Sequence, residues 1–105
     1  MNKENHVYKL IVLEEVKDFI DSLPEKDRVK ITSEVEALCN AYFSVLYIKT
    51  LRGKVKELIV GRYRIIFFIE VCIIYLIRIF IKKTKKAPRA EIEYAEKIYK
   101  IINKQ

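Results

Sequence analysis

The feature that most constrains the fold is a nearly unbroken apolar stretch, residues 65–81, which only Glu70 and Arg78 interrupt. This stretch is shorter than the ~20 residues that a membrane-spanning helix needs. Each of the two charges would also cost roughly 2.5–3.5 kcal/mol at the middle of a bilayer. Because its many isoleucines favour β-strands, the sequence predicts strands here and no association with a membrane.

Turn signals divide this region and its surroundings into short strands. Residues that favour tight turns, Gly61 with Arg62, separate two apolar runs, which should therefore pair as a hairpin. A second turn is expected near residues 70–72, and a basic turn around Gly53 at residues 49–56. The expected strands are, in chain order, residues 6–12, 56–60, 63–69 and 73–81.

Three amphipathic helices complete the pattern, because apolar residues recur at helical spacing in three places. Pro24 and Pro88 suit the first turns of the second and third helix. The apolar stripes are Leu13, Val16, Ile20 and Leu23, then Ile31, Val35, Leu38 and Tyr42, then Ile92, Ala95, Ile98 and Ile102. The order β-α-α-β-β-β-α predicts a single α+β domain over residues 1–105, with a mostly antiparallel sheet and its helices packed on one face.

The charge of the chain is unevenly distributed. Residues 1–48 carry six Lys or Arg against nine Asp or Glu, a net −3, whereas residues 49–105 carry fifteen against five, a net +10. A basic half of this kind indicates a polyanionic ligand, an acidic protein partner or both, although a solvated surface without a ligand gives the same composition.

Cysteine and histidine usage restricts the compartment and the cofactors. Cys39 and Cys72 both lie in apolar surroundings, which predicts two buried free thiols. Residues 1–6 are polar and no secretion signal follows, so a reducing cytoplasmic location is expected. With His6 as the single histidine, a zinc site has no ligand set, and no cofactor or metal is expected.

Basic and aromatic residues gather around the expected hairpin. Alternation puts Lys54 with Lys56, Arg62 with Arg64, and Arg78 with Lys82 on one face of their strands. If these three faces coincide, the sheet carries a basic patch that neutralises phosphates, with aromatic rings to stack on unpaired bases. Candidate nucleic-acid contacts are Arg52, Lys54, Tyr63, Arg78, Lys83, Lys85 and Lys86.

Such a patch is chemically able to cleave RNA without a metal ion. In this reaction the 2′-hydroxyl attacks the neighbouring phosphate, and the site must accept a proton, stabilise a pentacoordinate anion and protonate the leaving oxygen. Crowded cations can depress the pKa of a lysine enough for proton transfer, and arginine clamps the anion. The candidate catalytic residues are Arg64, Lys82, Arg62 and Lys56.

Several motifs in residues 50–95 resemble one known family. They are Thr50-Leu51-Arg52-Gly53, Lys56-Glu57-Leu58, Tyr63-Arg64-Ile65-Ile66-Phe67, Phe80-Ile81-Lys82-Lys83-Thr84-Lys85-Lys86-Ala87-Pro88, and Glu91-Ile92 with Ala95. This pattern is similar to the phage-derived HigB-like branch of the RelE/ParE toxins of type II toxin–antitoxin systems. The resemblance covers nearly the whole chain in its order of elements, and its most specific piece is the Phe-x-Lys-Lys-Thr-x-Lys-x-Pro element.

The resemblance implies a RelE-like fold, mRNA cleavage in association with the ribosome, and neutralisation by a cognate antitoxin. Arg64 matches the family's strand arginine, and Lys82 and Lys83 match its twin lysines. Lys54 and Lys56 match the basic residues before the hairpin. Where the family usually has an arginine after the Glu-Leu pair, this chain has Ile59, and Arg62 is a candidate substitute.

Two alternatives share the same fold and stay open at this point, since fold alone does not fix function. One is a non-catalytic inhibitor of DNA gyrase, as in the ParE branch. The other is a degenerate, inactive toxin, which the departures from the family pattern at Ile59 and at Arg78-Ile79 allow.

Overall fold

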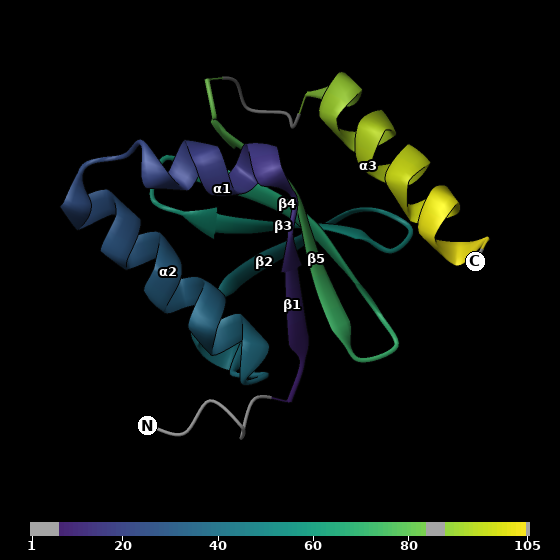
Figure 1. Cartoon of the computed structure of the whole chain (residues 1–105), viewed down its shortest axis with the longest axis horizontal. Helices are drawn as coiled ribbons and strands as arrows, with labels where there is room; N and C mark the ends of the chain where they lie inside the picture. Colours follow the sequence, from purple (N-terminus) through teal and green to yellow (C-terminus); the bar gives the residue numbers. More distant parts are fainter. Residues whose placement is uncertain (1–6, 84–87, 105) are drawn as a thin grey trace.

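The computed structural model describes residues 7–83 and 88–104, and these form one sheet covered by three α-helices (Figure 1). In chain order the elements are β1 (Lys9–Val12), α1 (Glu14–Asp21), α2 (Glu25–Cys39), the 3-10 helix η2 (Phe43–Val45), β2 (Tyr47–Arg52), β3 (Val55–Val60), β4 (Tyr63–Glu70), β5 (Ile73–Ile81) and α3 (Arg89–Asn103). The α+β class is confirmed, with one strand more than expected.

The five strands lie in the order β1-β5-β4-β3-β2. β1 runs parallel to β5, and the other neighbours are antiparallel, which confirms a mostly antiparallel sheet. Each hairpin begins its turn with a residue at positive φ, namely Gly53 at 54°, Gly61 at 58° and Val71 at 57°. Val71 is β-branched and adopts this conformation at a steric cost. Because a valine occupies the position where a glycine is usual, the last turn had no glycine signal in the sequence.

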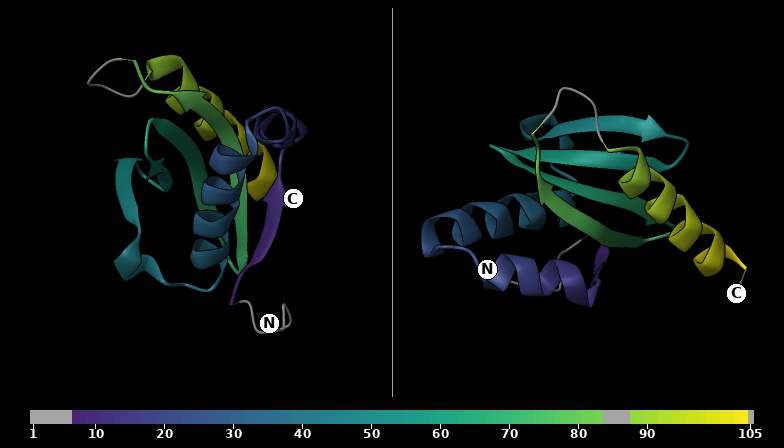
Figure 2. Two further views of the ribbon diagram at one scale, coloured as in Figure 1. Left: turned by 90° about the vertical axis from the view of Figure 1, so that its left-hand side faces the viewer. Right: turned by 90° about the horizontal axis from the view of Figure 1, so that it is seen from above.

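The helices cover both faces of the sheet, so the expectation that all of them pack on one face is wrong. Figures 1 and 2 show α1 and α2 on one side and α3 on the other, and we call these sides the α1–α2 face and the α3 face. In the middle of β4, the side chains that point to either face of the sheet are all buried. A strand that is apolar on both sides needs cover on both sides, and α3 supplies the second layer.

Each face has its own hydrophobic core. On the α1–α2 face the larger core joins Ile31 and Leu38 of α2 to Leu58, Ile65, Phe67 and Leu76 of the sheet. On the α3 face a smaller core joins Ala95, Ile98 and Ile102 of α3 to Val55, Ile66, Phe68 and Ile77. The apolar stripe expected along the last helix is therefore confirmed, while the face that it covers was not predicted.

The apolar stretch at residues 65–81, for which a membrane-spanning helix was considered, forms most of β4, a turn and β5, as predicted. No described helix is both long and apolar enough to span a membrane. The first strand begins at Lys9, and His6, at which it was expected to begin, lies outside the described residues.

Three local expectations are corrected. The basic turn expected at residues 49–56 is mostly strand, because β2 runs to Arg52 and only Gly53 and Lys54 form the turn. Tyr42 does not continue the stripe of α2, since that helix ends at Cys39 and Tyr42 is 60% exposed. Cys39 is buried as expected, but Cys72 is exposed because it lies in the turn between β4 and β5.

Candidate functional site

Two rows of side chains cross the α3 face from β2 to β5, because directly opposed residues in neighbouring strands point to the same side of a sheet. The first row is Tyr47, Ile59, Arg64 and Phe80. The second row, one step further along the strands, is Lys49, Glu57, Ile66 and Arg78. The strand arginine therefore lies between apolar neighbours, at the end of the sheet where β5 stops.

Arg64 is held in a fixed direction by the backbone of its own hairpin. Its Nη1 donates hydrogen bonds to the carbonyl oxygens of Gly61 at 2.8 Å and of Tyr63 at 3.0 Å. Its Nε is buried and has no hydrogen-bond partner within the described part of the chain. Because its direction is fixed, this guanidinium is suited to bind an anion through donors that the backbone does not use.

Glu57 is the unusual member of the second row. Its side chain is completely buried, and neither carboxylate oxygen has a hydrogen-bond partner among the described residues. Lys49 lies opposite it on β2, and Arg64 is a diagonal neighbour on β4. Burying a carboxylate without a partner costs several kcal/mol, so this acid is retained at an energetic cost beside the arginine of the site.

Lys82 extends the same end of the sheet. Its backbone N–H donates to the carbonyl oxygen of Arg62 at 3.0 Å, which continues the β4–β5 ladder one pair beyond Ile81. Continued alternation from Phe80 predicts Lys82 on the side of Arg64 and Lys83 on the opposite side. Both Lys82 and its opposite residue Arg62 lie just beyond the strands, and the side chain of Arg62 turns toward α2. Lys82 is partly buried, whereas Lys83 is exposed.

Arg62, the third predicted catalytic residue, does not lie with Arg64 on the α3 face. Its Nη2 donates to the hydroxyl of Tyr63 at 3.3 Å and lies 3.5 Å from Oδ2 of Asp27 in α2. The hydrogen bond to Tyr63 and the charge of Asp27 together raise the pKa of Arg62. Its guanidinium is thus directed toward α2, on the other side of the sheet from Arg64.

Tyr63 was expected to contact nucleic acid, but its ring is not accessible for base stacking. Its side chain is 4% exposed and packs edge-on against Phe19 of α1. Its hydroxyl donates to Oδ2 of Asp27 at 2.6 Å. Alternation explains the outcome, because a residue next to Arg64 in the same strand must point into the α1–α2 core.

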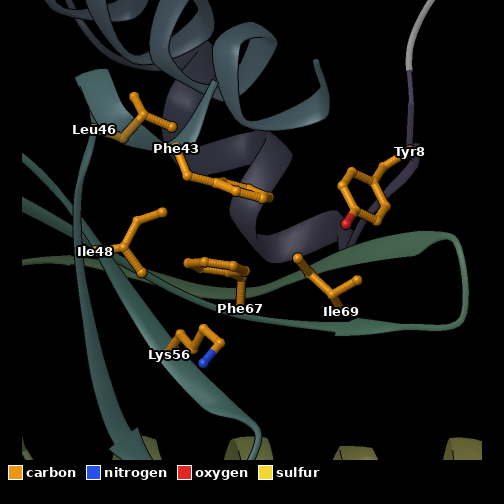
Figure 3. Close-up of a pocket in the computed structure, with 7 residues that line it drawn as sticks. All are labelled: Tyr8, Phe43, Leu46, Ile48, Lys56, Phe67 and Ile69. Carbon is orange, nitrogen blue, oxygen red and sulfur yellow. The ribbon is translucent and has the colours of Figure 1, made fainter. Parts of the chain in front are cut away.

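Lys56, the fourth predicted catalytic residue, also lies on the α1–α2 face. It is opposite Phe67 in the ladder and lines an apolar pocket with Tyr8 and Phe43 (Figure 3). The sheet therefore separates its ammonium group from Arg64, and the expected coincidence of the three basic faces does not extend to Lys56.

Two of the predicted RNA-binding arginines hold α3 against the sheet instead. Nε of Arg78 donates to Glu91 at 2.7 Å, its Nη1 donates to Glu15 at 2.9 Å, and its guanidinium lies over the ring of Tyr94 at 4.4 Å. Burial lowers the pKa of Arg78, but the bonds and charges of the two glutamates outweigh it, so the net shift is upward. Arg52 pairs with Glu96 at 2.8 Å.

The remaining predicted contacts are dispersed. Lys54 is exposed in the β2–β3 turn, at the end of the hairpin opposite to Gly61. Five residue steps along β3 separate these two ends, which corresponds to about 17 Å at the rise of a strand. Lys85 and Lys86 lie outside the described residues.

Sequence reasoning missed four residues of the two rows: Tyr47, Lys49, Glu57 and Phe80. Tyr47 is 76% exposed, so its ring is the one accessible aromatic face that the first row offers at its β2 edge. Tyr47 and Lys49 alternate with Leu46 and Ile48 in a period-two pattern, which would have identified the start of β2 as a strand with one polar side.

Comparison with known proteins agrees with this architecture. The fold matches a chain in the crystal structure of an archaeal RelE–RelB complex from Pyrococcus horikoshii OT3, with a TM-score of 0.65, 16% sequence identity, and coverage of 71% of this chain and 94% of that chain. No curated protein is significantly similar in sequence. This structural match shows a RelE-like fold and thus confirms the expected fold.

The family is given by sequence. Residues 18–100 match the model of the family described as "Phage derived protein Gp49-like". Because this match spans most of the chain, the protein belongs to the Gp49-like family.

Proposed function

We propose that this protein is a toxin of a type II toxin–antitoxin system, a metal-independent endoribonuclease that cleaves mRNA in association with the ribosome, within the cytoplasm. The observation that carries the proposal is the placement of Arg64 on the α3 face, where two backbone carbonyls fix the direction of its guanidinium. Lys82 follows on the same side of the sheet, and the exposed ring of Tyr47 stands at the end of the same row.

These groups have distinct parts in the reaction. The 2′-hydroxyl loses its proton to solvent water as its oxygen attacks the adjacent phosphorus, the bond to the 5′-oxygen breaks, and a 2′,3′-cyclic phosphate and a 5′-hydroxyl result. Arg64 stabilises the negative charge on the pentacoordinate phosphorane. Lys82 gives a proton to the leaving 5′-oxygen or neutralises it. Tyr47 stacks on a neighbouring base, and Lys49 and Lys83 contact phosphates of the strand.

The test is expression of the protein in growing bacteria with mapping of mRNA 5′ ends. Wild type should arrest growth and produce new 5′ ends within translated messages. Arg64→Ala should lose both effects, by about 10²–10³-fold in cleavage, because one anion-stabilising donor contributes that much. Arg89→Ala is the matched control, since Arg89 is exposed on α3 and pairs with Glu93 of the same helix at 3.4 Å. Growth arrest with intact messages would reject the nuclease and point to gyrase inhibition.

We also propose that a cognate antitoxin neutralises the protein through an acidic segment. The structural neighbour from Pyrococcus is a toxin–antitoxin complex, and residues 49–105 of this chain carry a net charge of +10. Complementary charge speeds association, so the rate of complex formation should fall as salt is added. An association rate that is independent of salt would contradict this assignment.

A further inference from the structure

A pocket on the α1–α2 face has no part in the proposed reaction. Its volume is ≈ 340 Å³, and it opens between the segment around η2 and the sheet (Figure 3). Its apolar walls are Tyr8, Phe43, Leu46, Ile48, Phe67 and Ile69. The rings of Tyr8 and Phe43 lie side by side at 6.2 Å between centroids. A space of this size and lining is suited to receive an apolar side chain.

Among the described residues that line this pocket, Lys56 is the one that carries a charge. Its Nζ donates to Oγ1 of Thr50 at 3.3 Å, and no described carboxylate forms an ion pair with it. A partly buried ammonium at the edge of an apolar pocket favours a ligand that brings a carboxylate next to its apolar group.

The surface beside the pocket is too apolar for a site that serves only a small molecule. Phe43 is 40% exposed, and its neighbours Tyr42 and Val45 are 60% and 71% exposed in the same short segment. Exposed apolar residues clustered at a pocket mark a protein-binding surface. A second copy of this chain is disfavoured as the occupant, since two chains of net charge +7 repel each other.

We infer that this pocket anchors the antitoxin, by taking an apolar side chain whose neighbouring Asp or Glu pairs with Lys56. The identity of the partner rests on the proposed function, whereas the ligand chemistry follows from the pocket itself. The anchor lies on the opposite face of the sheet from Arg64 and Lys82. In this proposal the antitoxin is held by the α1–α2 face, whereas the nuclease site that it blocks lies on the α3 face.

The ligand chemistry is tested first with a small probe, 3-phenylpropionate, in a titration of the amide resonances of the full chain. Resonances of Tyr8, Phe43 and Ile48 should shift, and the acid should bind about fivefold more tightly than its neutral amide, 3-phenylpropanamide. Lys56→Met should abolish that preference, and Lys54→Met, the matched change in the neighbouring turn, should retain it. Equal affinities for acid and amide, or no shift at these residues, would overturn the inference.

The same resonances test whether a second copy of this chain occupies the pocket. If the pocket resonances move with protein concentration when no probe is present, self-association fills the pocket and the inference is wrong. Resonances that stay constant upon dilution leave the pocket free for a partner.

The partner is tested by co-expression with the product of the reading frame adjacent to its gene. Phe43→Ser should remain toxic but escape rescue, while Val29→Ser, an exposed apolar position on α2 outside the pocket, should be rescued like wild type. Full rescue of Phe43→Ser would overturn the inference. If the wild type itself is not toxic, the proposed function fails, and the probe titration still decides the chemistry of the pocket.

Discussion

The two faces of the same sheet differ in what they contain. The α1–α2 face holds the larger core, in which Ile31, Leu38, Ile65 and Phe67 are completely buried. The α3 face holds a smaller core and, beside it, Glu57, Arg64 and Arg78. Since a strand alternates its side chains, β3, β4 and β5 supply stability on one side and charge on the other. Alternate positions along the strands therefore have different roles in this small chain: those on the α1–α2 face build the larger core, and those on the α3 face carry the candidate functional residues.

The largest expected effect tests whether stability resides mainly on the α1–α2 face. Phe67→Ala removes a completely buried ring from that core, and should lower the free energy of unfolding by about 3–5 kcal/mol. Phe80→Ala makes the same change at a partly buried position on the α3 face, and should cost about 1–2 kcal/mol. Urea unfolding followed by circular dichroism measures both, and equal losses would refute the asymmetry.

The next effect sharpens the assignment of chemistry to the α3 face. Lys82→Ala should lower the rate of RNA cleavage by about 10²-fold, because Lys82 shares the side of Arg64 and serves in proton transfer or anion stabilisation. Lys83→Ala should chiefly weaken RNA binding and make it less dependent on salt. Single-turnover cleavage and binding at two salt concentrations separate these outcomes. If the two variants lose the same activity, the assignment of faces is wrong.

A smaller effect concerns the buried acid of the α3 face. Glu57→Met replaces an unpaired buried carboxylate by an apolar side chain of similar length. This variant should raise the free energy of unfolding by about 1–4 kcal/mol and lower cleavage, because the carboxylate beside Arg64 is lost. Denaturation and cleavage assays on the same preparation provide both readouts. A destabilised Glu57→Met protein would show that the carboxylate has a partner in solution.

The smallest effect uses the two cysteines, which differ in environment. Cys39 lies in the α1–α2 core, where burial, with a contribution from Glu36, raises the pKa of its thiol. Cys72 is exposed in the β4–β5 turn. Iodoacetamide should therefore modify one thiol in the native protein and both in urea, as mass spectrometry of the intact chain reports. Rapid modification of Cys39 in native buffer would indicate that this core opens.

Much of the fold was readable locally. Helices α1 and α3 and strands β3, β4 and β5 follow from apolar periodicity and from Gly61 and Pro88 within the segments themselves. β2 was missed because Lys49, Arg52 and Lys54 suggested a solvated turn, although its alternation was present. In the candidate site, Arg64 and Lys82 were predicted from motif and parity and stay predictions, whereas Glu57 and Tyr47 became candidates only from the register of β2, β3 and β4.

The sequence by itself determined the class of the fold, the family and the basic character of the second half, because periodicity, motifs and charge are properties of neighbouring residues. Only the tertiary structure decided which face α3 covers, and that Lys56 and Arg64 lie on opposite sides of the sheet. It also decided that Arg78 is paired, since its partners Glu15 and Glu91 come from two different helices. These outcomes depend on contacts between segments far apart in the chain, which no local pattern encodes.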